Sequence, residues 1–408
     1  MKKKFLLVSM IAAAMLTASC SKEDNGDNSE QPVNVEQQIV QNTRPIVIKV
    51  DKKTSLSKVG TSDGYVLTFS EGDKLVLTDG ATQYAELNLQ AGDEGKQTAT
   101  FTGEISTEAD GKEIYATVGS PLEGVQTSSE SLADVVAKNC YLKSAAFTYS
   151  QETALNVELN DQNAYLVFSV SEGQKKVNIG GENDWYPTDG NIANQKLYVA
   201  VSAGEVSGRF FGTKTLDASK IYTITREDVV DLGPDFSVLW TTCNLGANNP
   251  GEYGYYYAYG ETAGYAWGDG HNFSSRYTGT DNPLPAANDA ATAYATTNNW
   301  GAGYRMPTDG ECQTLANIKT NPKDGDEYTF EKNRGATFKT SYGSVFLPAA
   351  GYCGGTHRVL DGSNGYYWSS TPNGKSFAHC LNFYSGSADV VYDDCMCGQS
   401  VRAVRCMN

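Results

Sequence analysis

The sequence predicts a multi-domain protein in which an all-β sandwich precedes an α+β domain. A chain of 408 residues has room for two or three domains, each with its own core. Short apolar runs divided by Gly, Asp, Asn and Ser fill the first half, without a sustained helical period. Near Asp228 tyrosine, tryptophan and cysteine become frequent and alanine-rich stretches begin. We therefore expect one domain over residues 44–227 and a second over 228–408.

The first twenty residues have the pattern of a secretion signal. Three lysines, Lys2 to Lys4, precede an apolar run from Phe5 to Ala18. This run is shorter than the ~20 residues that a membrane-spanning helix needs, so residues 1–19 are predicted to be a removed signal peptide. The small residues before Cys20 resemble a bacterial lipobox, with Thr17 where a branched aliphatic residue is usual.

Cys20 is accordingly the predicted site of lipid attachment. Several acyl chains of the palmitate type on one cysteine give stable membrane anchoring, which a single chain does not. Ser21 and the acidic residues after it resemble the export signal of surface lipoproteins in Bacteroidetes, which implies the outer face of the outer membrane. The alternative is an incidental cysteine after an ordinary cleavage site, but no Ala-x-Ala site fits better.

Charge and composition exclude some classes of binding partner. Removal of the signal peptide takes away three lysines and lowers the formal net charge from −16 to −19. Such an acidic chain is not expected to bind nucleic acid or an anionic membrane surface. No second apolar run is long enough to span a bilayer, so everything after Cys20 is expected to be soluble.

Residues 20–43 are predicted to be a disordered acidic spacer, because they are rich in amides and acids and poor in apolar residues. Beyond the spacer a helix is expected only at Ser131–Ala137 in the first domain. Its strands are expected at Pro45–Val50, Tyr65–Thr68, Lys74–Leu77, Thr98–Thr102, Glu113–Val118, Ala154–Leu159, Tyr165–Val170, Lys176–Ile179, Leu197–Val201 and Ile221–Ile224.

The second domain is predicted to contain two helices. One is expected at Pro285–Asn298, and the other at Thr308–Lys319, where Thr308 and Glu311 form a capping box. Its later strands are expected at Phe346–Leu347, Tyr366–Ser369, Ala378–Tyr384 and Ser400–Arg405.

The first domain resembles the fimbrillin-like pilins of Bacteroidetes, which implies a transthyretin-like sandwich and a role in adhesion. The blocks that carry the resemblance follow one another in order: Phe69–Lys74, Ala99–Gly103, Glu113–Thr117, Ala164–Phe168 and Leu197–Val201. In that family a trypsin-like protease cuts after an arginine near the first strand and frees a groove for donor-strand assembly. Here only Arg44 precedes Arg209, and Pro45 follows it, so we do not expect this maturation.

The second domain resembles the Fibrobacter succinogenes major paralogous domain, which is similar to the C-type-lectin-like fold of formylglycine-generating enzymes and of retroelement-diversified binding proteins. The resemblance implies a ligand-binding role by analogy of fold. Seven ordered blocks carry it: Asp231–Gly233, Trp240–Ala247, Glu252–Thr262, Gly303–Thr308, Phe346–Tyr352, Gly365–Thr371 and Ser400–Val404.

The diversified relatives display their ligand surface from the end of the fold that corresponds to the segment between the Trp368 and Val401 strands. This resemblance implies a ligand-binding surface in that segment, with ordinary solvated loops as the alternative. The candidate residues are Asn373, Lys375, His379, Asn382, Tyr384, Asp389, Tyr392, Asp393 and Asp394. A second candidate is the aromatic run Tyr253–Trp267, which is suited to sugar faces but is favoured as scaffold.

No catalytic site is expected. The three histidines lack the His-Glu-x-x-His spacing, and no paired cysteine motif of the zinc type is present, so neither a metal nor another cofactor is predicted. The segment Gly60–Gly64 matches Gly-x-Ser-x-Gly but lacks the flanking strand and helix, and is expected to be a turn. A calcium site at Asp389, Asp393 and Asp394 is a minor alternative, because the calcium-lectin signatures are absent.

The second domain contains an odd number of cysteines, so at least one is unpaired. Spacing cannot assign disulfides among them, and buried free thiols are the alternative. They are Cys243, Cys312, Cys353, Cys380, Cys395, Cys397 and Cys406. The late cysteines do not reproduce the motif of formylglycine-generating oxidases, which makes that activity a remote alternative.

Two functions remain. In the first, the protein is a cell-surface adhesin whose pilin-like stalk presents a lectin-like head, at a pilus tip or directly on the membrane, to host or bacterial glycans, to proteins or to other pilins. In the second, it is a surface lipoprotein that captures glycans for a nutrient transporter. The pilin resemblance of the first domain favours the adhesin.

Overall fold

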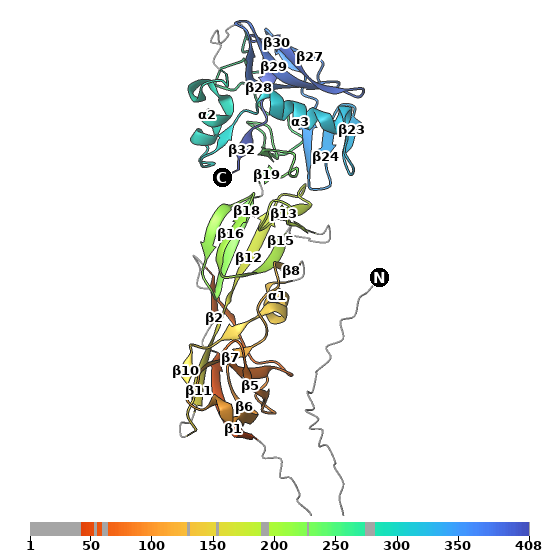
Figure 1. Cartoon of the computed structure of the whole chain (residues 1–408). Coiled ribbons are helices and arrows are strands. Elements are labelled where there is room, and N and C mark those ends of the chain that lie inside the picture. The colour runs from red at the N-terminus through yellow and green to blue at the C-terminus, as the bar shows by residue number, and fades with distance from the viewer. Residues whose placement is uncertain are drawn as a thin grey trace, which may run out of the picture. The chain divides into compact units, whose positions relative to one another are not determined.

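Two β-sheets, whose strands partly alternate along the chain, form most of the predicted first domain (Figure 1). The computed structural model describes residues 42–52, 55–58, 64–128, 131–151, 155–188, 196–226, 228–273 and 282–407. Cys20, nearly all of the spacer 20–43 and residues 60–63 of the Gly-x-Ser-x-Gly match lie outside them. None of the described helices is long and apolar enough to cross a membrane.

The first sheet has eight strands and closes on itself, because β9 pairs with β11 on one side and with β7 on the other. Its order is β10-β7-β4-β5-β6-β1-β11-β9. The strands are β1 (Thr43–Lys52), β4 (Lys74–Thr78), β5 (Gln83–Leu89), β6 (Thr98–Ser106), β7 (Glu113–Val118), β9 (Leu142–Lys143), β10 (Phe147–Thr148) and β11 (Leu155–Asp161). A 3-10 helix, η1 (Thr107–Ala109), follows β6.

Alternating apolar residues build the core of this sheet. In β1 the side chains of Ile48 and Val50 are fully buried, whereas Val47, which directly precedes Ile48, is exposed, as expected for a strand with one face inside. Between Phe69 and β4 the chain makes a tight turn, in which Gly72 has a φ of +87° and Asp73 accepts a hydrogen bond from Ser70 N at 3.0 Å. Glycine adopts this φ without steric cost.

The second sheet has six strands in the order β3-β2-β18-β12-β15-β8. They are β2 (Ser55–Lys58), β3 (Gly64–Val66), β8 (Gln126–Ser128), β12 (Asn163–Val170), β15 (Lys196–Ser202) and β18 (Lys220–Arg226). Two hairpins accompany it, β13 (Lys176–Asn178) with β14 (Trp185–Pro187) and β16 (Gly204–Gly208) with β17 (Gly212–Leu216). The helix α1 (Leu132–Asn139) begins after Ser131, whose hydroxyl accepts a hydrogen bond from Asp134 N.

The strand-rich character predicted for this region is confirmed, and each predicted strand has a counterpart. Both faces of β12 are buried: Tyr165 belongs to the core of the first sheet, and Leu166 and Phe168 belong to the core of the second. Sheets buried on both faces read as continuous apolar runs, as β12 does. The transthyretin-like topology stays a prediction.

In the C-terminal region, the described residues form four smaller sheets, two α-helices and a short 3-10 helix. One sheet, in the order β19-β20-β32-β22, consists of β19 (Val229–Val230), β20 (Val238–Thr241), β32 (Val404–Cys406) and β22 (Tyr304–Arg305). A second, in the order β21-β31-β28-β29-β30, consists of β21 (Tyr256–Tyr257), β31 (Gln399–Ser400), β28 (Gly365–Asn373), β29 (Phe377–Phe383) and β30 (Ala388–Asp394). The others are β23 (Glu327–Glu331), β24 (Gly335–Lys339) and β25 (Ser344–Pro348), and the pair β26 (Tyr352–Gly354) and β27 (His357–Val359).

The helix predicted at Thr308–Lys319 is confirmed as α3 (Asp309–Thr320), including its capping box. The prediction of one continuous helix at Pro285–Asn298 is wrong for the first residues of this range. The chain forms a 3-10 helix, η2 (Ala286–Asn288), and then α2 (Ala290–Thr297), because Asp289 has an extended backbone and its carboxylate accepts hydrogen bonds from Thr292 N and Met306 N.

The last predicted strand, Ser400–Arg405, is also interrupted. It divides into β31 and β32, which belong to different sheets. The buried Arg402 lies between them and donates hydrogen bonds to Asn244 Oδ1 and to the carbonyl oxygens of Thr241 and Phe346, at 2.9 to 3.0 Å. These contacts hold the chain out of a continuous strand.

The boundary predicted at Glu227 does not separate the hydrophobic cores. Val229, Leu239, Ala295 and Tyr304, which all follow Glu227, are buried in the same core as β12 and β15. The described residues from Asn42 to Asn408 form one compact unit.

Candidate functional site

The nine predicted ligand residues lie on or beside a hairpin at the edge of the five-stranded sheet (Figure 1). Asn373 ends β28, Lys375 is in the turn before β29, and Tyr384 directly follows β29. The other six are on β29 or β30. No strand was predicted between Tyr384 and Ser400, for which solvated loops were the alternative to a ligand-binding surface, but all seven residues of β30 pair with β29. Three aspartates in β30, a residue type that is rare in strands, concealed it.

The strand register divides these residues between two faces of the hairpin. Residues opposite one another in an antiparallel pair point to the same face, and successive residues alternate. His379 is opposite Tyr392, so these two share a face. Asn382 is opposite Asp389, and Asp393 is opposite the buried Ala378, so Asn382, Asp389 and Asp393 share the other. The nine candidate residues therefore do not form a single cluster that one ligand could contact.

The aspartates at the end of β30 hold the following turn. Asp393 accepts a hydrogen bond from Gln399 Nε2 at 2.9 Å and lies 3.8 Å from Cys397 Sγ. Asp394 accepts one from Met396 N at 2.9 Å. Burial raises the pKa of Asp393, although these hydrogen bonds lower it in part. Asp393 and Asp394 therefore serve the local fold, and the described residues offer no group of three or more His, Cys, Asp and Glu placed to hold a metal ion.

The exposed side chains of the hairpin are mainly apolar and aromatic. Tyr392 is 62% exposed and Tyr384 is 42% exposed. Sequence reasoning missed two further members, Phe377 at 42% and Val391 at 37%. The rings of Phe377 and Tyr392 meet edge to face with centroids 5.8 Å apart. An apolar residue in a strand is normally assigned to the core, and only the exposure of these two side chains in the structure shows that they lie outside it.

The aromatic run Tyr253–Trp267 is scaffold at its centre, as favoured from the sequence. Tyr256, Tyr257 and Tyr259 are each 1% exposed. Tyr256 Oη donates to Ala350 O at 2.7 Å, and Tyr259 Oη donates to Ser370 O at 3.0 Å, as buried tyrosine hydroxyls usually do. Trp267 differs from them because 48% of it is exposed.

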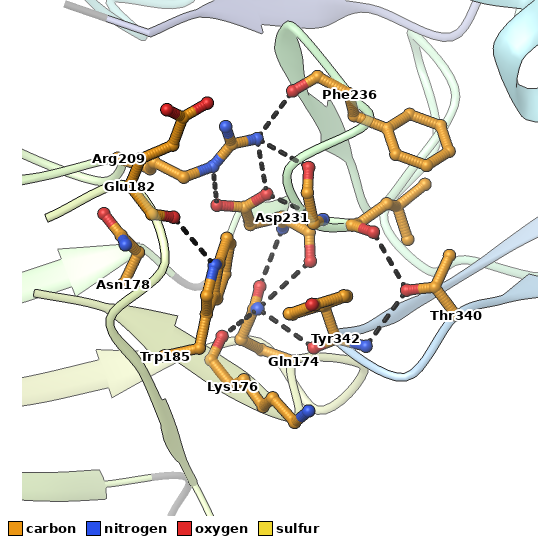
Figure 2. A network of polar contacts seen from close by, with 12 residues as sticks. Gln174, Lys176, Asn178, Glu182, Trp185, Arg209, Asp231, Phe236, Thr340 and Tyr342 are labelled. Carbon is orange, nitrogen blue, oxygen red and sulfur yellow. Dashed lines mark hydrogen bonds and ion pairs between the residues drawn. The ribbon is translucent and has the colours of Figure 1, made fainter. Parts of the chain in front are cut away.

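Residues before and after Glu227 are joined by a buried polar network (Figure 2). Asp231 is fully buried and accepts hydrogen bonds from Arg209, Nε to Oδ2 at 2.7 Å and Nη2 to Oδ1 at 2.9 Å. Arg209 Nη2 also donates to the carbonyl oxygens of Gly233 and Phe236. Burial raises the pKa of Asp231, and Arg209 offsets part of that rise.

Gln174 makes the second half of the network. Its Oε1 accepts a hydrogen bond from Asp231 N at 2.7 Å, and its Nε2 donates to Asp231 O at 3.1 Å and to Tyr342 O at 3.2 Å. The Tyr342 ring packs on Trp185 with centroids 4.6 Å apart (Figure 2). Gly343 has no room for a side chain, because an added Cβ would lie 2.6 Å from Asp231 O. The junction is thus closely packed.

The cysteines among the described residues are free thiols. Free thiols were the alternative to disulfides that the sequence left open. Cys312, Cys353, Cys380 and Cys395 are buried. Burial raises the pKa of Cys353 to about 11 and, together with Asp393, that of Cys397 to about 12. Thiols with raised pKa values are poor nucleophiles at neutral pH.

Comparisons with known proteins give one partial family match and several similar structures. The family model "Domain of unknown function (DUF8237)" matches residues 336–404, which run from β24 to β32. The chain is similar to a fimbrial protein from Bacteroides ovatus, with 12% identity and a TM-score of 0.25 over 89% of this chain and 99% of that one. It is also similar to a fimbrial assembly protein from Parabacteroides distasonis, with 10% identity and a TM-score of 0.25 over 46% of this chain and 92% of that one. A comparison with curated protein sequences gives no match.

Proposed function

We propose that the protein is a cell-surface lipoprotein adhesin with a binding role and no catalytic one. Cys20 carries the lipid that anchors it to the outer face of the outer membrane. Residues 44–227 form a pilin-like stalk, and the C-terminal region is the lectin-like head that binds the ligand. The observation that carries the proposal is the pair of exposed aromatic side chains Phe377 and Tyr392, which share one face of the β29–β30 hairpin and whose rings meet edge to face.

This hairpin concentrates the exposed apolar side chains of the described residues. Of the eight large hydrophobic residues that are exposed there, Phe377, Tyr384, Val391 and Tyr392 belong to this one element. Apolar groups gathered on a soluble surface are typical of binding sites, and tyrosine is enriched among the residues that dominate interfaces. Because β30 is the last strand of its sheet, its outer edge is available to a partner.

The packed junction supports presentation of this hairpin by the stalk. If a flexible linker joined the head to the stalk, the binding surface would have no fixed orientation relative to the stalk. The contacts of Arg209 and Gln174 with Asp231, and the core shared across residue 227, instead favour a head fixed to the second sheet. Such a head suits an accessory or tip subunit of a pilus as well as a monomeric surface protein.

The test uses the whole chain from Ser21, without lipid, on arrays of glycans and of host and bacterial surface proteins. We expect a subset of array members to bind, and the double variant Phe377→Ser, Tyr392→Ser to lose binding to at least one of them. Val47→Thr is the matched control, because Val47 is 63% exposed on β1, far along the chain from the hairpin. Silence of the unmodified chain on all arrays, or full binding by the double variant, would refute the proposal. Tight binding only to a polysaccharide used as food would favour the nutrient-capture alternative.

A further inference from the structure

Residues 265–273 form a loop that encloses a small pocket separate from the hairpin. Both ends of the loop are tied to the framework. Tyr265 exchanges two backbone hydrogen bonds with Tyr256, at 3.0 and 3.1 Å, and Phe273 N donates to Gly355 O at 3.3 Å. The Phe273 ring packs so closely on Gly398 that an added Cβ there would lie 2.7 Å from the ring. The pocket is therefore formed before any ligand arrives.

Aromatic rings make most of its wall. The Tyr265 and His271 rings are stacked, with centroids 3.5 Å apart and planes inclined by 6°. Phe273 meets both of them edge-on, with centroid distances of 6.0 and 4.6 Å. Trp267 and Thr356 also line the cavity, which has a volume of about 130 Å³. This is below the ~300–1,000 Å³ of pockets for drug-sized ligands.

The positive charge of Arg358, which lies next to the pocket, is already compensated by other residues. The Arg358 guanidinium lies over both the Trp267 ring and the Tyr253 ring, 5.0 and 5.2 Å from the centroids. Arg358 also forms an ion pair with Asp361 at 2.8 Å. The site therefore holds no uncompensated positive charge from Arg358 that would favour an anionic ligand.

One buried nitrogen atom of the pocket wall has no partner. His271 lines the pocket, and its Nε2 is among the side-chain atoms of the described residues that are shielded from solvent and form no hydrogen bond. Buried polar atoms without partners are rare and unfavourable, and in a pocket they indicate a group that the ligand supplies. A hydroxyl group is suited to this nitrogen, because a hydroxyl can donate and accept.

We propose that this pocket binds a neutral pyranose, such as the terminal sugar of a surface glycan. The apolar face of the ring stacks on Trp267, half of which is exposed. A sugar hydroxyl pairs with His271 Nε2. The volume limits the site to one sugar residue, and the Asp361 pairing of Arg358 favours neutral over acidic sugars. This site does not depend on the β29–β30 hairpin.

The test is a titration of the whole chain from Ser21 with methyl glycosides of glucose, galactose, mannose, N-acetylglucosamine and N-acetylgalactosamine. Saturation-transfer NMR and calorimetry report binding, and sialic acid serves as the acidic comparison. We expect saturable binding of at least one neutral glycoside. Trp267→Ala weakens it about ten-fold or more, because stacking is lost, and Trp267→Phe, which keeps a ring, weakens it less.

Tyr392→Ala is the matched control, since Tyr392 is an exposed aromatic residue on the separate hairpin. It should leave glycoside binding unchanged while it weakens ligand capture on the arrays, so failure of one proposal does not imply failure of the other. Absence of saturable binding by every neutral glycoside overturns the inference. Unchanged binding by both Trp267 variants, or tighter binding of sialic acid than of any neutral sugar, overturns it as well.

Discussion

Arg209 and Asp231 form an ion pair with two parallel hydrogen bonds, 2.7 and 2.9 Å long, across the junction between the second sheet and the C-terminal region. Asp231 is fully buried, and the Arg209 side chain is 18% exposed. The guanidinium also satisfies the carbonyl oxygens of Gly233 and Phe236. One side chain thus neutralises a buried charge and fixes the path of the chain after β19.

We expect Arg209→Ala to lower the free energy of unfolding by about 3–5 kcal/mol. The substitution leaves Asp231 buried without its cation, and removal of one partner of a buried pair is strongly destabilising. Urea denaturation followed by circular dichroism measures the change. The matched control is Lys323→Ala, which breaks the exposed pair with Asp235 and should cost no more than about 1 kcal/mol. Equal effects of the two variants would show that the junction pair contributes no more than a surface pair.

The contact between Arg209 and Asp231 could not be predicted from the sequence, although both residues belong to segments that the sequence analysis discusses. Asp231 belongs to the Asp231–Gly233 block used for the family resemblance, but its partner lies 22 positions earlier in a different hairpin. Local signals succeeded where both partners are neighbours, as in the capping box of Thr308 and Glu311. Asp289 shows the opposite case, because its contact with Met306 N, 17 positions away, ends η2 where local propensity continues the helix.

The exposed residues of the proposed binding surface were predicted only in part, for a related reason. Polarity selected Asp393 and Asp394, which the turn after β30 uses for its own hydrogen bonds. Apolar character assigned Phe377 and Val391 to the core, but both are exposed. Val391 is exposed even though Cys380, its partner residue in β29, is fully buried. Exposure depends on what packs over each position, so the sequence of a single strand does not reveal which of its side chains are covered.

The mature chain should keep β1 in place. The Arg44 guanidinium pairs with both carboxylate oxygens of Asp110, and it lies 5.4 Å from the centre of the Tyr149 ring. β1 is hydrogen-bonded to β6 on one side and to β11 on the other. A protease would have to pull the strand from the sheet and cut before Pro45, so we expect the mature protein to begin at Cys20.

Mass spectrometry of the protein from outer membranes tests this expectation, because a lipid-modified N-terminal peptide should be found. Limited trypsin digestion should leave the bond after Arg44 intact. The variant Pro45→Ala separates the two causes of resistance: if the sheet protects the bond, the variant also stays uncut under native conditions. A natural N-terminus at Pro45 or later would contradict the prediction.

Asp161 should make stability depend on pH in weakly acidic solution. It is fully buried and accepts hydrogen bonds from Tyr165 Oη at 2.8 Å and Asn163 N at 3.1 Å. Burial raises its pKa to about 6, from 3.8 for an exposed aspartate. The folded state therefore holds the proton more tightly than the unfolded state does. This contribution is complete below pH ~4 and is lost as the pH rises to ~6, a change of about 3 kcal/mol.

Asp161→Asn removes the titrating group and keeps its shape. The difference between the free energies of unfolding of this variant and of the unmodified protein should therefore change in the variant's favour between pH ~4 and ~6. Urea denaturation at a series of pH values measures it. Asp324→Asn, at an exposed position, is the matched control for the substitution itself. A constant difference for Asp161→Asn across this range would mean that Asp161 ionises as an exposed carboxylate does.

Leu239 belongs to the C-terminal region, but its burial depends on the second sheet. It is fully buried in the core that contains Leu166 and Phe168 of β12, whereas its neighbours Val238 and Trp240 face the core of the C-terminal region. A fragment that begins at Asp228 lacks β12, so Leu239 would lie exposed there. We expect Leu239→Ala to destabilise the whole chain by about 3 kcal/mol and the fragment by much less. Leu315→Ala is the matched control, because Leu315 is buried among residues that all follow Glu227 and should cost the same in both. Equal losses from Leu239→Ala in chain and fragment would mean that the head completes its core without the stalk.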